Sequence, residues 1–176
     1  FLYVAKFINR KRPLDIIQAA LNNCDENAHF ILVGDGCLLE ECKQFVSQNN
    51  VKNINFVGFL NQSEIPAYYA AADVFVLPSH YETWGLVLNE AMASGLPGIV
   101  SNTCGAAVDM IKEGVTGYTY PMGDIDELAR LFKKFTDSPG LNKQLGLDAG
   151  VHVEKFSLAE TIRALRDCLD LESDKA

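Results

Sequence analysis

Short apolar segments alternate along the chain with longer stretches in which apolar residues recur at helical spacing. The short segments are rich in β-branched and aromatic residues and are apolar on both faces, which is typical of buried strands in a parallel sheet. They are Leu2–Ala5, Phe30–Val33, Ile54–Val57, Val74–Leu77, Ile99–Ser101 and Tyr118–Tyr120. The helical stretches are Leu14–Asn22, Leu38–Gln48, Ser63–Ala71, Leu86–Ser94, Val108–Lys112 and Asp126–Thr136. This order predicts an α/β fold, in which a parallel sheet of about six strands carries helices on both faces.

The last third of the chain carries helical patterns only. Ser138 and Pro139 are predicted to end one helix and to open the next. Ser157 and Glu160 stand three residues apart and form a capping box, which predicts a last helix at Leu158–Leu169.

No internal repeat or linker interrupts these patterns, so residues 1–176 are expected to form one domain. The sequence starts inside a strand pattern and without Met. Because a native terminus seldom starts in a core strand, we expect that a preceding part of the polypeptide is absent from this chain.

Composition excludes several classes of protein. A chain of 176 residues can bury enough apolar surface to fold without staples. Its 15 Lys and Arg against 23 Asp and Glu give a net charge of −8, which argues against nucleic acid as a partner. No apolar run is long enough to cross a bilayer. The five cysteines form no CxxC pair and no His stands at ligand spacing, so we expect reduced thiols, no metal and a cytoplasmic location.

The basic residues are unevenly distributed. Lys6, Arg10, Lys11 and Arg12 lie within seven positions just after the first predicted strand, whereas residues 53–111 contain no Lys or Arg. Ligands of parallel sheets bind at the carboxyl ends of the strands. The cluster therefore predicts a site for an anionic ligand, with a solvated loop surface as the alternative.

A glycine-rich turn follows the second predicted strand. As a dinucleotide fingerprint, Gly34-Asp35-Gly36 is weak, because Leu39 holds the third glycine position and the motif belongs after the first strand. We interpret it as a tight turn that needs Gly at positive φ. No GxxxxGK[ST] motif occurs, which excludes ATP hydrolysis by a P-loop.

Two carboxylates eight residues apart stand in the densest motif, which runs from Pro78 to Pro97. Glu82 is expected in a loop and Glu90 in the early turns of the next helix, too far apart to share one proton or one metal. The helix N-terminus between them has no basic residue nearby in sequence and suits a phosphate. The carboxylates would then accept hydrogen bonds from sugar or ribose hydroxyls. The alternative is two solvated acids.

These residues resemble the Glu-x7-Glu signature of the retaining GT-B glycosyltransferases of family 4, the glycosyl transferases group 1. The signature lies in PSHYETWGLVLNEAMASGLPGIVS, and VAKFINRK, ILVGDG, INFVGFL and DMIKEGVTGY resemble further segments of that family in the same order. The resemblance covers almost the whole chain. It implies that the chain is the C-terminal half of a GT-B fold, the donor-binding one of two facing Rossmann-like domains, and that the N-terminal acceptor domain is absent.

The resemblance also implies catalytic roles. Lys6 and Lys11 would neutralise the diphosphate of a nucleotide-sugar donor. Gly85 and Leu86 would donate backbone N–H groups to its distal phosphate, and Glu82 would accept from hydroxyls of the transferred sugar.

Further donor-binding positions follow from the same resemblance. Glu90 would hold the ribose hydroxyls, and the loop of Gly58 and Phe59 would lie against the base. Thr83 and Trp84 belong to the expected site, where the Trp84 ring is either a stacking surface or part of the core.

The chain departs from the family pattern at a few positions. Lys6 stands where Arg is usual, Ala5 and Arg12 replace common glycines, and Cys104-Gly105 replaces a Gly-Gly pair. These departures leave the identity of the donor open.

The implied reaction transfers a sugar from a nucleoside diphosphate to an acceptor hydroxyl with retention at the anomeric carbon. Negative charge builds on the leaving diphosphate, where fixed donors would stabilise it without a metal or other cofactor. Glu82 would position the sugar, with a covalent nucleophile as the alternative. The acceptor is expected to be a glycan or lipid in polysaccharide, lipopolysaccharide or glycolipid synthesis, with peripheral association of the absent half at the inner face of a membrane.

Two other functions remain open on the sequence alone. One is half of a sugar-nucleotide epimerase, and the other is a nucleotide-sugar-binding module without catalysis. A receiver domain fits less well, because its acidic pocket should follow the first strand, where this sequence has Lys6 and Lys11.

Overall fold

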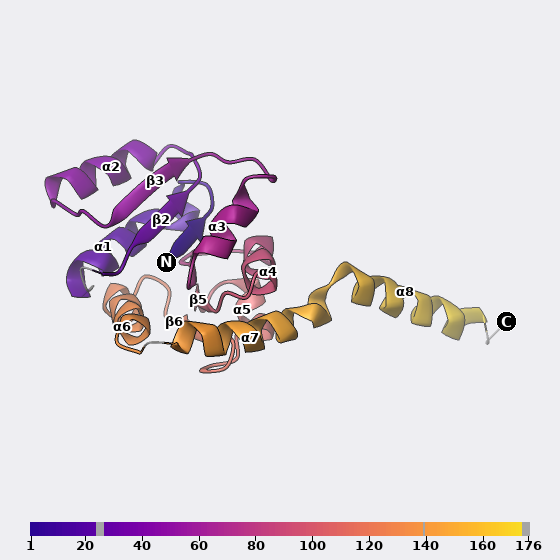
Figure 1. Cartoon of the computed structure of the whole chain (residues 1–176). Coiled ribbons are helices and arrows are strands. Elements are labelled where there is room, and N and C mark those ends of the chain that lie inside the picture. The colour runs from indigo at the N-terminus through magenta and orange to yellow at the C-terminus, as the bar shows by residue number, and fades with distance from the viewer. Residues whose placement is uncertain (24–26, 139, 174–176) are drawn as a thin grey trace.

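The computed structural model describes residues 1–23, 27–138 and 140–173 (Figure 1). Its centre is a six-stranded sheet in the order β3-β2-β1-β4-β5-β6, and every neighbouring pair of strands is parallel. The strands are β1 (Leu2–Val4), β2 (Phe30–Val33), β3 (Ile54–Gly58), β4 (Phe75–Leu77), β5 (Gly98–Ser101) and β6 (Gly117–Tyr120). The predicted Rossmann-like parallel sheet is confirmed, and each strand agrees with its predicted bounds to within about one residue.

Helices follow the strands in the predicted order. They are α1 (Pro13–Asn23), α2 (Leu39–Gln48), α3 (Ile65–Ala71), α4 (Leu86–Ala93), α5 (Gly105–Met110), α6 (Ile125–Thr136), α7 (Leu141–Val153) and α8 (Leu158–Ser173), with 3-10 turns η1 (Asn9–Lys11) and η2 (Glu154–Phe156). Helix α3 begins later than predicted, because the Ser63 N–H donates to the Asn61 side chain at 3.0 Å in a local turn. The predicted break at Pro139 lies outside the described residues.

The predicted helix at Val108–Lys112 is wrong in its bounds. Helix α5 begins earlier, directly at Gly105, where a Cβ atom would lie 2.1 Å from the backbone oxygen of Thr83. The missing side chain lets the start of this helix pack against a neighbouring loop. At the other end, the Lys112 N–H donates to Thr116 Oγ1 at 2.8 Å, which closes a turn in place of further helix.

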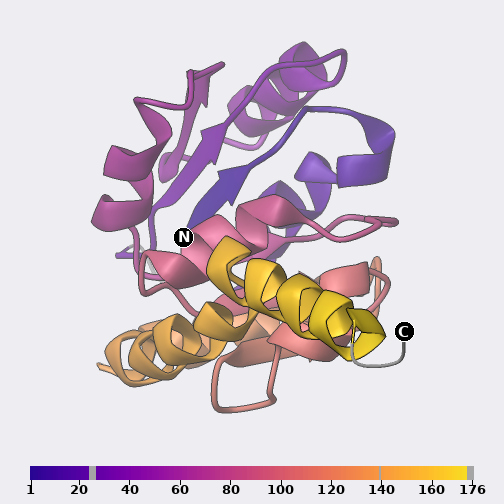
Figure 2. The ribbon, with the colours of Figure 1, turned by 90° about the vertical axis from the view of Figure 1, so that its right-hand side faces the viewer.

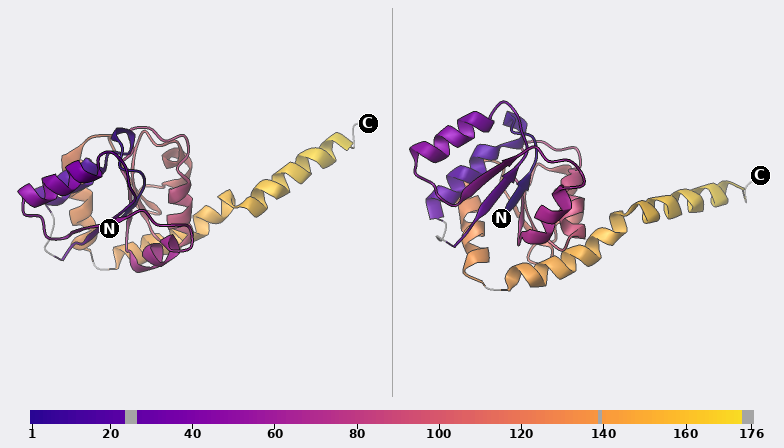
Figure 3. Two further views of the ribbon diagram at one scale, coloured as in Figure 1. Left: turned by 90° about the horizontal axis from the view of Figure 1, so that it is seen from above. Right: turned by 45° about the horizontal axis from the view of Figure 1, so that its top comes forward.

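A hydrophobic core lies on each face of the sheet, as the two-residue period of a strand requires. On β1, Tyr3 packs into a cluster with residues of α1, α2 and α6, whereas Leu2 and Val4 pack into a second cluster with residues of α3, α4 and α5. Figure 3 shows these two groups of helices on opposite sides of the strands. The expectation of helices on both faces is confirmed.

Helix α8 extends away from the rest of the molecule (Figures 1 and 3) and comes toward the viewer in Figure 2. The predicted cap is present, since the Glu160 N–H donates to Ser157 Oγ at 3.3 Å. Exposed apolar side chains recur along this helix at helical spacing. They are Leu158, Ile162, Leu165 and Leu169. Among the helices that the structure describes, none is long and apolar enough to span a membrane.

Candidate functional site

The order of the strands reverses between β1 and β4, which are neighbours in the sheet. The loops that leave the carboxyl ends of these two strands run in opposite directions along the sheet. Such a switch point opens a crevice, which is where ligands of open α/β sheets bind. The basic cluster follows β1, and the Glu82 motif follows β4. Strand order therefore brings the two predicted halves of the site together.

Hydrogen bonds join the two loops directly. The His80 N–H donates to the carbonyl of Arg10 at 2.8 Å, and the Arg10 guanidinium donates to the carbonyl of Tyr81 at 3.1 Å. With the backbones held in this way, Lys11 Nζ donates to Glu82 Oε2 across 71 residues of sequence. Only 13% of the Lys11 side chain and 14% of the Glu82 side chain are exposed. Two of the three residues predicted to be catalytic, Lys11 and Glu82, thus form a largely buried ion pair.

The Glu82 loop is also held from the side of β5. Gly105 donates its N–H to the carbonyl of Glu82 at 2.8 Å, and Ala106 donates to the carbonyl of Trp84 at 3.2 Å. This contact depends on the close approach of Gly105 to Thr83. From the sequence, Gly105 stands out only because Cys104-Gly105 replaces the Gly-Gly pair of the family. The signal that could have found its role is a glycine at the start of a helix that directly follows a buried strand.

Helix α4 begins at the same loop. Gly85 caps it in the left-handed region with φ +102, and Leu86 is 69% exposed. Within the described residues, the N–H groups of Gly85, Leu86 and Val87 donate no hydrogen bond. The predicted helix N-terminus is therefore open. Although no basic residue is near this helix start in sequence, the β1 loop brings Lys11 to Glu82, three residues before the Gly85 cap.

A hollow of about 250 Å³ opens at the carboxyl ends of β1 and β2. Its lining residues are mainly apolar, with one exposed cation. They are Val4, Ala5, Lys6, Val33, Gly34, Asp35, Phe59, Leu60, Ile65 and Val87. Phe59 is 77% exposed, and the preceding Gly58 has φ +85 and accepts a hydrogen bond from the Gly34 N–H at 2.8 Å. Lys6 therefore lies at the apolar hollow, whereas Lys11 lies at Glu82.

The glycine turn after β2 supports the basic loop. The Phe7 N–H donates to the carbonyl of Asp35 at 2.9 Å, and a Cβ atom on Gly36 would lie 2.5 Å from the Phe7 oxygen. Gly34 and Gly36 have φ +135 and +153. The interpretation as a tight turn with Gly at positive φ is confirmed.

Glu90 is exposed on α4, and Tyr69 on α3 reaches it. The buried Tyr69 hydroxyl donates to Glu90 Oε2 at 2.9 Å, in a hollow that both residues line. Burial, together with the adjacent Glu90 carboxylate, raises the pKa of Tyr69, so the hydroxyl keeps its proton. Sequence reasoning missed Tyr69, because nothing in its own segment marks it. Among the described residues, the hollow that Glu90 lines does not include Glu82.

The sequence profile of the glycosyl transferases group 1 matches residues 1–149. This chain belongs to that family. It is 31% identical over 173 residues to the Escherichia coli UDP-Gal:alpha-D-GlcNAc-diphosphoundecaprenol alpha-1,3-galactosyltransferase, covering 95% of this chain and 44% of that protein. The chain spans less than half the length of this relative and 31% of the Arabidopsis thaliana sulfoquinovosyl transferase SQD2, to which it is 30% identical over 91% of its own length.

Two solved structures have the same fold. HepE of Anabaena, solved in complex with UDP, matches with a TM-score of 0.86 at 22% identity, over 96% of this chain and 48% of that one. The C-terminal domain of LpcC, a group 1 protein of Francisella tularensis, matches with a TM-score of 0.81 at 25% identity, over 89% of this chain and 86% of that domain. The chain is therefore similar to one half of HepE and to nearly all of the LpcC C-terminal domain.

In this group 1 chain, the ring of Trp84 is partly buried and packs against the core cluster that contains Leu2 and Val4. It packs against Phe156 with ring centroids 5.7 Å apart, and its Nε1–H donates to Asn89 Oδ1 at 2.8 Å. The Trp84 ring thus contacts the C-terminal segment, whereas the backbone carbonyls of Thr83 and Trp84 contact the start of α5. Among the residues that the structure describes, no group of three or more His, Cys, Asp and Glu side chains could hold a metal ion.

Proposed function

We propose that this chain is the donor-binding domain of a retaining glycosyltransferase of family 4, which transfers a sugar from a nucleoside-diphosphate sugar to an acceptor hydroxyl. One observation carries the proposal: at the switch point, the Lys11–Glu82 pair lies beside the open start of α4. A cation and a helix N-terminus suit phosphate, and a carboxylate accepts from sugar hydroxyls. Membership of the glycosyl transferases group 1 supports the same reaction.

The diphosphate would lie between Lys6, Lys11 and the N–H groups of Gly85 and Leu86. When the sugar–oxygen bond breaks, negative charge develops on this diphosphate. A donor that is already fixed at the place where charge develops lowers the barrier by about 3–4 kcal/mol. These four groups would therefore supply much of the leaving-group stabilisation, and we expect no metal or other cofactor.

The contacts of Glu82 support a positioning role over a nucleophilic one. Its Oε2 accepts from Lys11, and its Oε1 lies 3.9 Å from the Arg10 guanidinium. Because an ammonium has three N–H donors, Lys11 can keep this contact while it also binds a phosphate oxygen. Lys11 would thus connect the leaving group to the carboxylate that holds the transferred sugar.

The nucleoside would occupy the more apolar side of the crevice. Phe59 offers an exposed ring and Gly58 an adjacent backbone to the base. Glu90, oriented by the Tyr69 hydroxyl, would accept from the ribose hydroxyls. UDP bound to HepE makes a uridine nucleotide the first ligand to test.

The acceptor, a glycan or lipid, would be bound by an N-terminal domain outside this chain. The share of each relative's length that this chain covers supports this division. The exposed apolar row of α8 would pack against that domain. We place the protein in the cytoplasm, in polysaccharide, lipopolysaccharide or glycolipid synthesis, with peripheral association at the inner face of the membrane through the absent half.

A thermal-shift screen of this chain against UDP, GDP, ADP and their sugars tests donor binding. A ligand that binds only the folded state at about 100 times its Kd adds about 2.7 kcal/mol to the free energy of unfolding and raises the Tm. We expect one nucleotide to raise the Tm. The Lys11→Ala variant should lose this shift, and Lys43→Ala, which removes an exposed cation on α2, should keep it. A chain stabilised by no nucleotide would overturn the proposal.

A transfer assay tests the division of labour. This chain alone should bind the nucleotide without transferring sugar, and the full-length protein should transfer it with retention. Robust transfer by the chain alone would refute the two-domain arrangement. Formation of a C2-inverted sugar nucleotide without acceptor would favour the epimerase, and binding of donor by the full-length protein without turnover would favour a non-catalytic module.

A further inference from the structure

A third hollow, of about 550 Å³, lies at the β1 and β4 loops. The proposed function assigns no ligand group to it. Its lining residues come from the β1 and β4 loops. They are Asn9, Arg10, Arg12, His80 and Tyr81. None of them is acidic, although the chain carries a net charge of −8. None of them lines the hollow that contains Lys6. The two arginines therefore form a basic surface separate from the expected nucleoside side of the crevice.

Arg10 is held at the rim of this hollow. Its Nη1 donates to the carbonyl of Tyr81 at 3.1 Å, and the same nitrogen lies 3.9 Å from Glu82 Oε1. The side chain is 46% exposed. Within the described residues, its other guanidinium nitrogens donate no hydrogen bond. A guanidinium has five N–H donors, so most of its capacity faces solvent next to the carboxylate that would hold the sugar.

Arg12 is held more firmly, and at a conformational cost. It has φ +49, a left-handed conformation that costs about 1–2 kcal/mol for a residue other than glycine. Its Nε donates to Oδ2 of Asp15 at 2.6 Å, and Asp15 is only 4% exposed. Burial raises the pKa of Asp15, while the Arg12 guanidinium acts in the opposite direction. Within the described residues only Nε of Arg12 donates a hydrogen bond, and 31% of its side chain is exposed.

We propose that Arg10 and Arg12 bind an anionic group, a phosphate, carboxylate or sulfonate, carried by a sugar that lies against Glu82. The inference rests on the proposed function. Arg10 Nη1 lies 3.9 Å from Glu82 Oε1, so a sugar that binds Glu82 would reach this arginine with its own substituents. Arginine suits such a group because its planar fork can make two parallel hydrogen bonds to it. The anion belongs either to the transferred sugar or to the acceptor, and these sources can be separated.

Matched pairs of ligands test the proposal on this chain by isothermal titration. If UDP-glucuronate binds more tightly than UDP-glucose, the anion belongs to the donor sugar. If glucose 6-phosphate binds more tightly than glucose, each measured with saturating UDP, the anion belongs to the acceptor. We expect one charged ligand to bind about 10-fold more tightly than its neutral counterpart, as charge-assisted hydrogen bonds require.

Variants test whether the hollow causes the preference for the charged ligand. Arg10→Gln should reduce the affinity ratio of charged to neutral ligand to within about twofold. Arg12→Lys should reduce this ratio several-fold at unchanged net charge, because the planar guanidinium is lost. Arg166→Gln, which removes a charge from an exposed position on α8, should keep the full preference. Tm values of all variants without ligand confirm that each is folded. The proposal fails if neither charged ligand is preferred, or if the preference survives in Arg10→Gln and Arg12→Lys.

The outcome also separates this proposal from the proposed function. If UDP does not bind, donor binding fails, and the hollow is then tested with glucose 6-phosphate alone by its ³¹P NMR line width. Line broadening that Arg10→Gln removes would support the anion site without a nucleotide site. No broadening by the unmodified chain would overturn it.

Discussion

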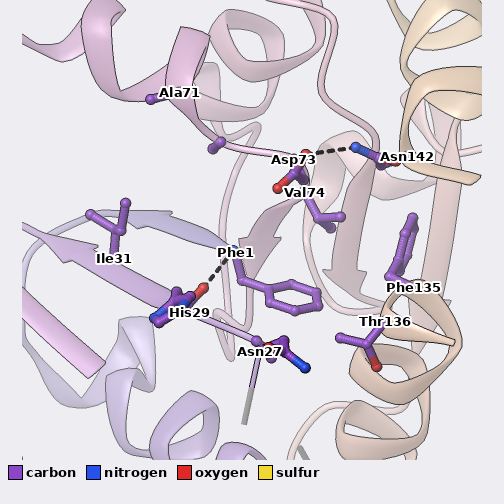
Figure 4. Close-up of a pocket in the computed structure, with 12 residues that line it drawn as sticks. Phe1, Asn27, His29, Ile31, Ala71, Asp73, Val74, Phe135, Thr136 and Asn142 are labelled. Carbon is purple, nitrogen blue, oxygen red and sulfur yellow. Dashed lines mark hydrogen bonds between the residues drawn. The ribbon is translucent and has the colours of Figure 1, made fainter. Parts of the chain in front are cut away.

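Both ends of the sheet carry hollows, and they differ in what surrounds them. The hollow at the amino end, shown in Figure 4, measures about 420 Å³, whereas at the carboxyl end the Lys6 hollow measures about 250 Å³ and the Arg10 hollow about 550 Å³. In the amino-end hollow, Asp73 accepts a hydrogen bond from Asn142 at 2.7 Å, and the amino group of Phe1 donates to the His29 carbonyl at 2.8 Å. The lining of the amino-end hollow is mainly apolar, and these polar groups are already paired.

The carboxyl end holds its charges on loops instead. Each helix that follows a strand begins at this end, so its unpaired N–H groups and positive dipole end point there. Lys11 and Glu82 are held beside one such start, that of α4. The direction of the backbone and the placement of charge together indicate that an anionic substrate binds at the carboxyl end.

The largest expected effect tests this contrast directly. In the full-length enzyme, Lys11→Ala or Glu82→Ala should lower kcat about 100- to 1,000-fold, because each removes a group fixed at the developing charge or at the sugar. Asp73→Ala, which breaks the Asn142 contact at the other end, should leave kcat within about twofold. Steady-state kinetics measures both. If Lys11→Ala and Glu82→Ala both keep the activity of the unchanged enzyme, the assignment of the site to the carboxyl end is wrong.

The second prediction concerns the close approach that holds the Glu82 loop. Gly105→Ala places a Cβ where only 2.1 Å separates it from the Thr83 oxygen, so the loop must move. We expect a loss of about 1–3 kcal/mol in the free energy of unfolding in urea, together with weaker nucleotide binding. Gly150→Ala on α7 is the matched control, since its Cβ would meet nothing closer than 3.7 Å. An equal effect of both substitutions would show that the contact with Thr83 is unimportant.

A third prediction concerns the hydrophobic core between the two ends of the sheet, where the buried Cys42 thiol makes stability depend on pH. Burial raises the pKa of the Cys42 thiol to about 12 from an ordinary value of 9.0. The folded state therefore holds this proton more tightly, so the stability that Cys42 contributes is complete below pH 9 and falls between pH 9 and 12. At pH 10 the loss is on the order of 1 kcal/mol. Urea unfolding at pH 8 and pH 10 should show it, and Cys42→Ala should reduce the difference, whereas Cys37→Ala, at an exposed thiol, should not.

The smallest effect is expected on the nucleoside side. Tyr69→Phe removes the hydrogen bond to Glu90, which is worth about 1 kcal/mol, or about fivefold in nucleotide affinity. The same variant should bind UDP and 2′-deoxy-UDP more equally than the unchanged chain does, because Glu90 is then less well oriented. Tyr68→Phe, one residue away, should change neither value. Titration calorimetry distinguishes these outcomes, and a Tyr69→Phe variant that keeps its full preference for the ribonucleotide would contradict the role of Tyr69.

Much of the fold could be predicted because it depends on local periodicity. The strand segments are apolar, short and rich in β-branched residues, and every one of them forms a strand of the sheet. Glu82 and Lys11 could be singled out because charged residues follow those strands. Helix α5 was predicted wrongly, since its start depends on the contact of Gly105 with a distant loop rather than on its own pattern.

The sequence by itself determined which segments form strands and helices, that the sheet is parallel, and which charged residues follow its strands. Only the tertiary structure decided that β1 and β4 are neighbours, and with it the pairing of Lys11 with Glu82 and the joining of the two loops. It also decided that Tyr69 reaches Glu90. The physical reason is that periodicity reports how each segment packs against its surroundings, whereas contacts between distant residues depend on which strands lie side by side.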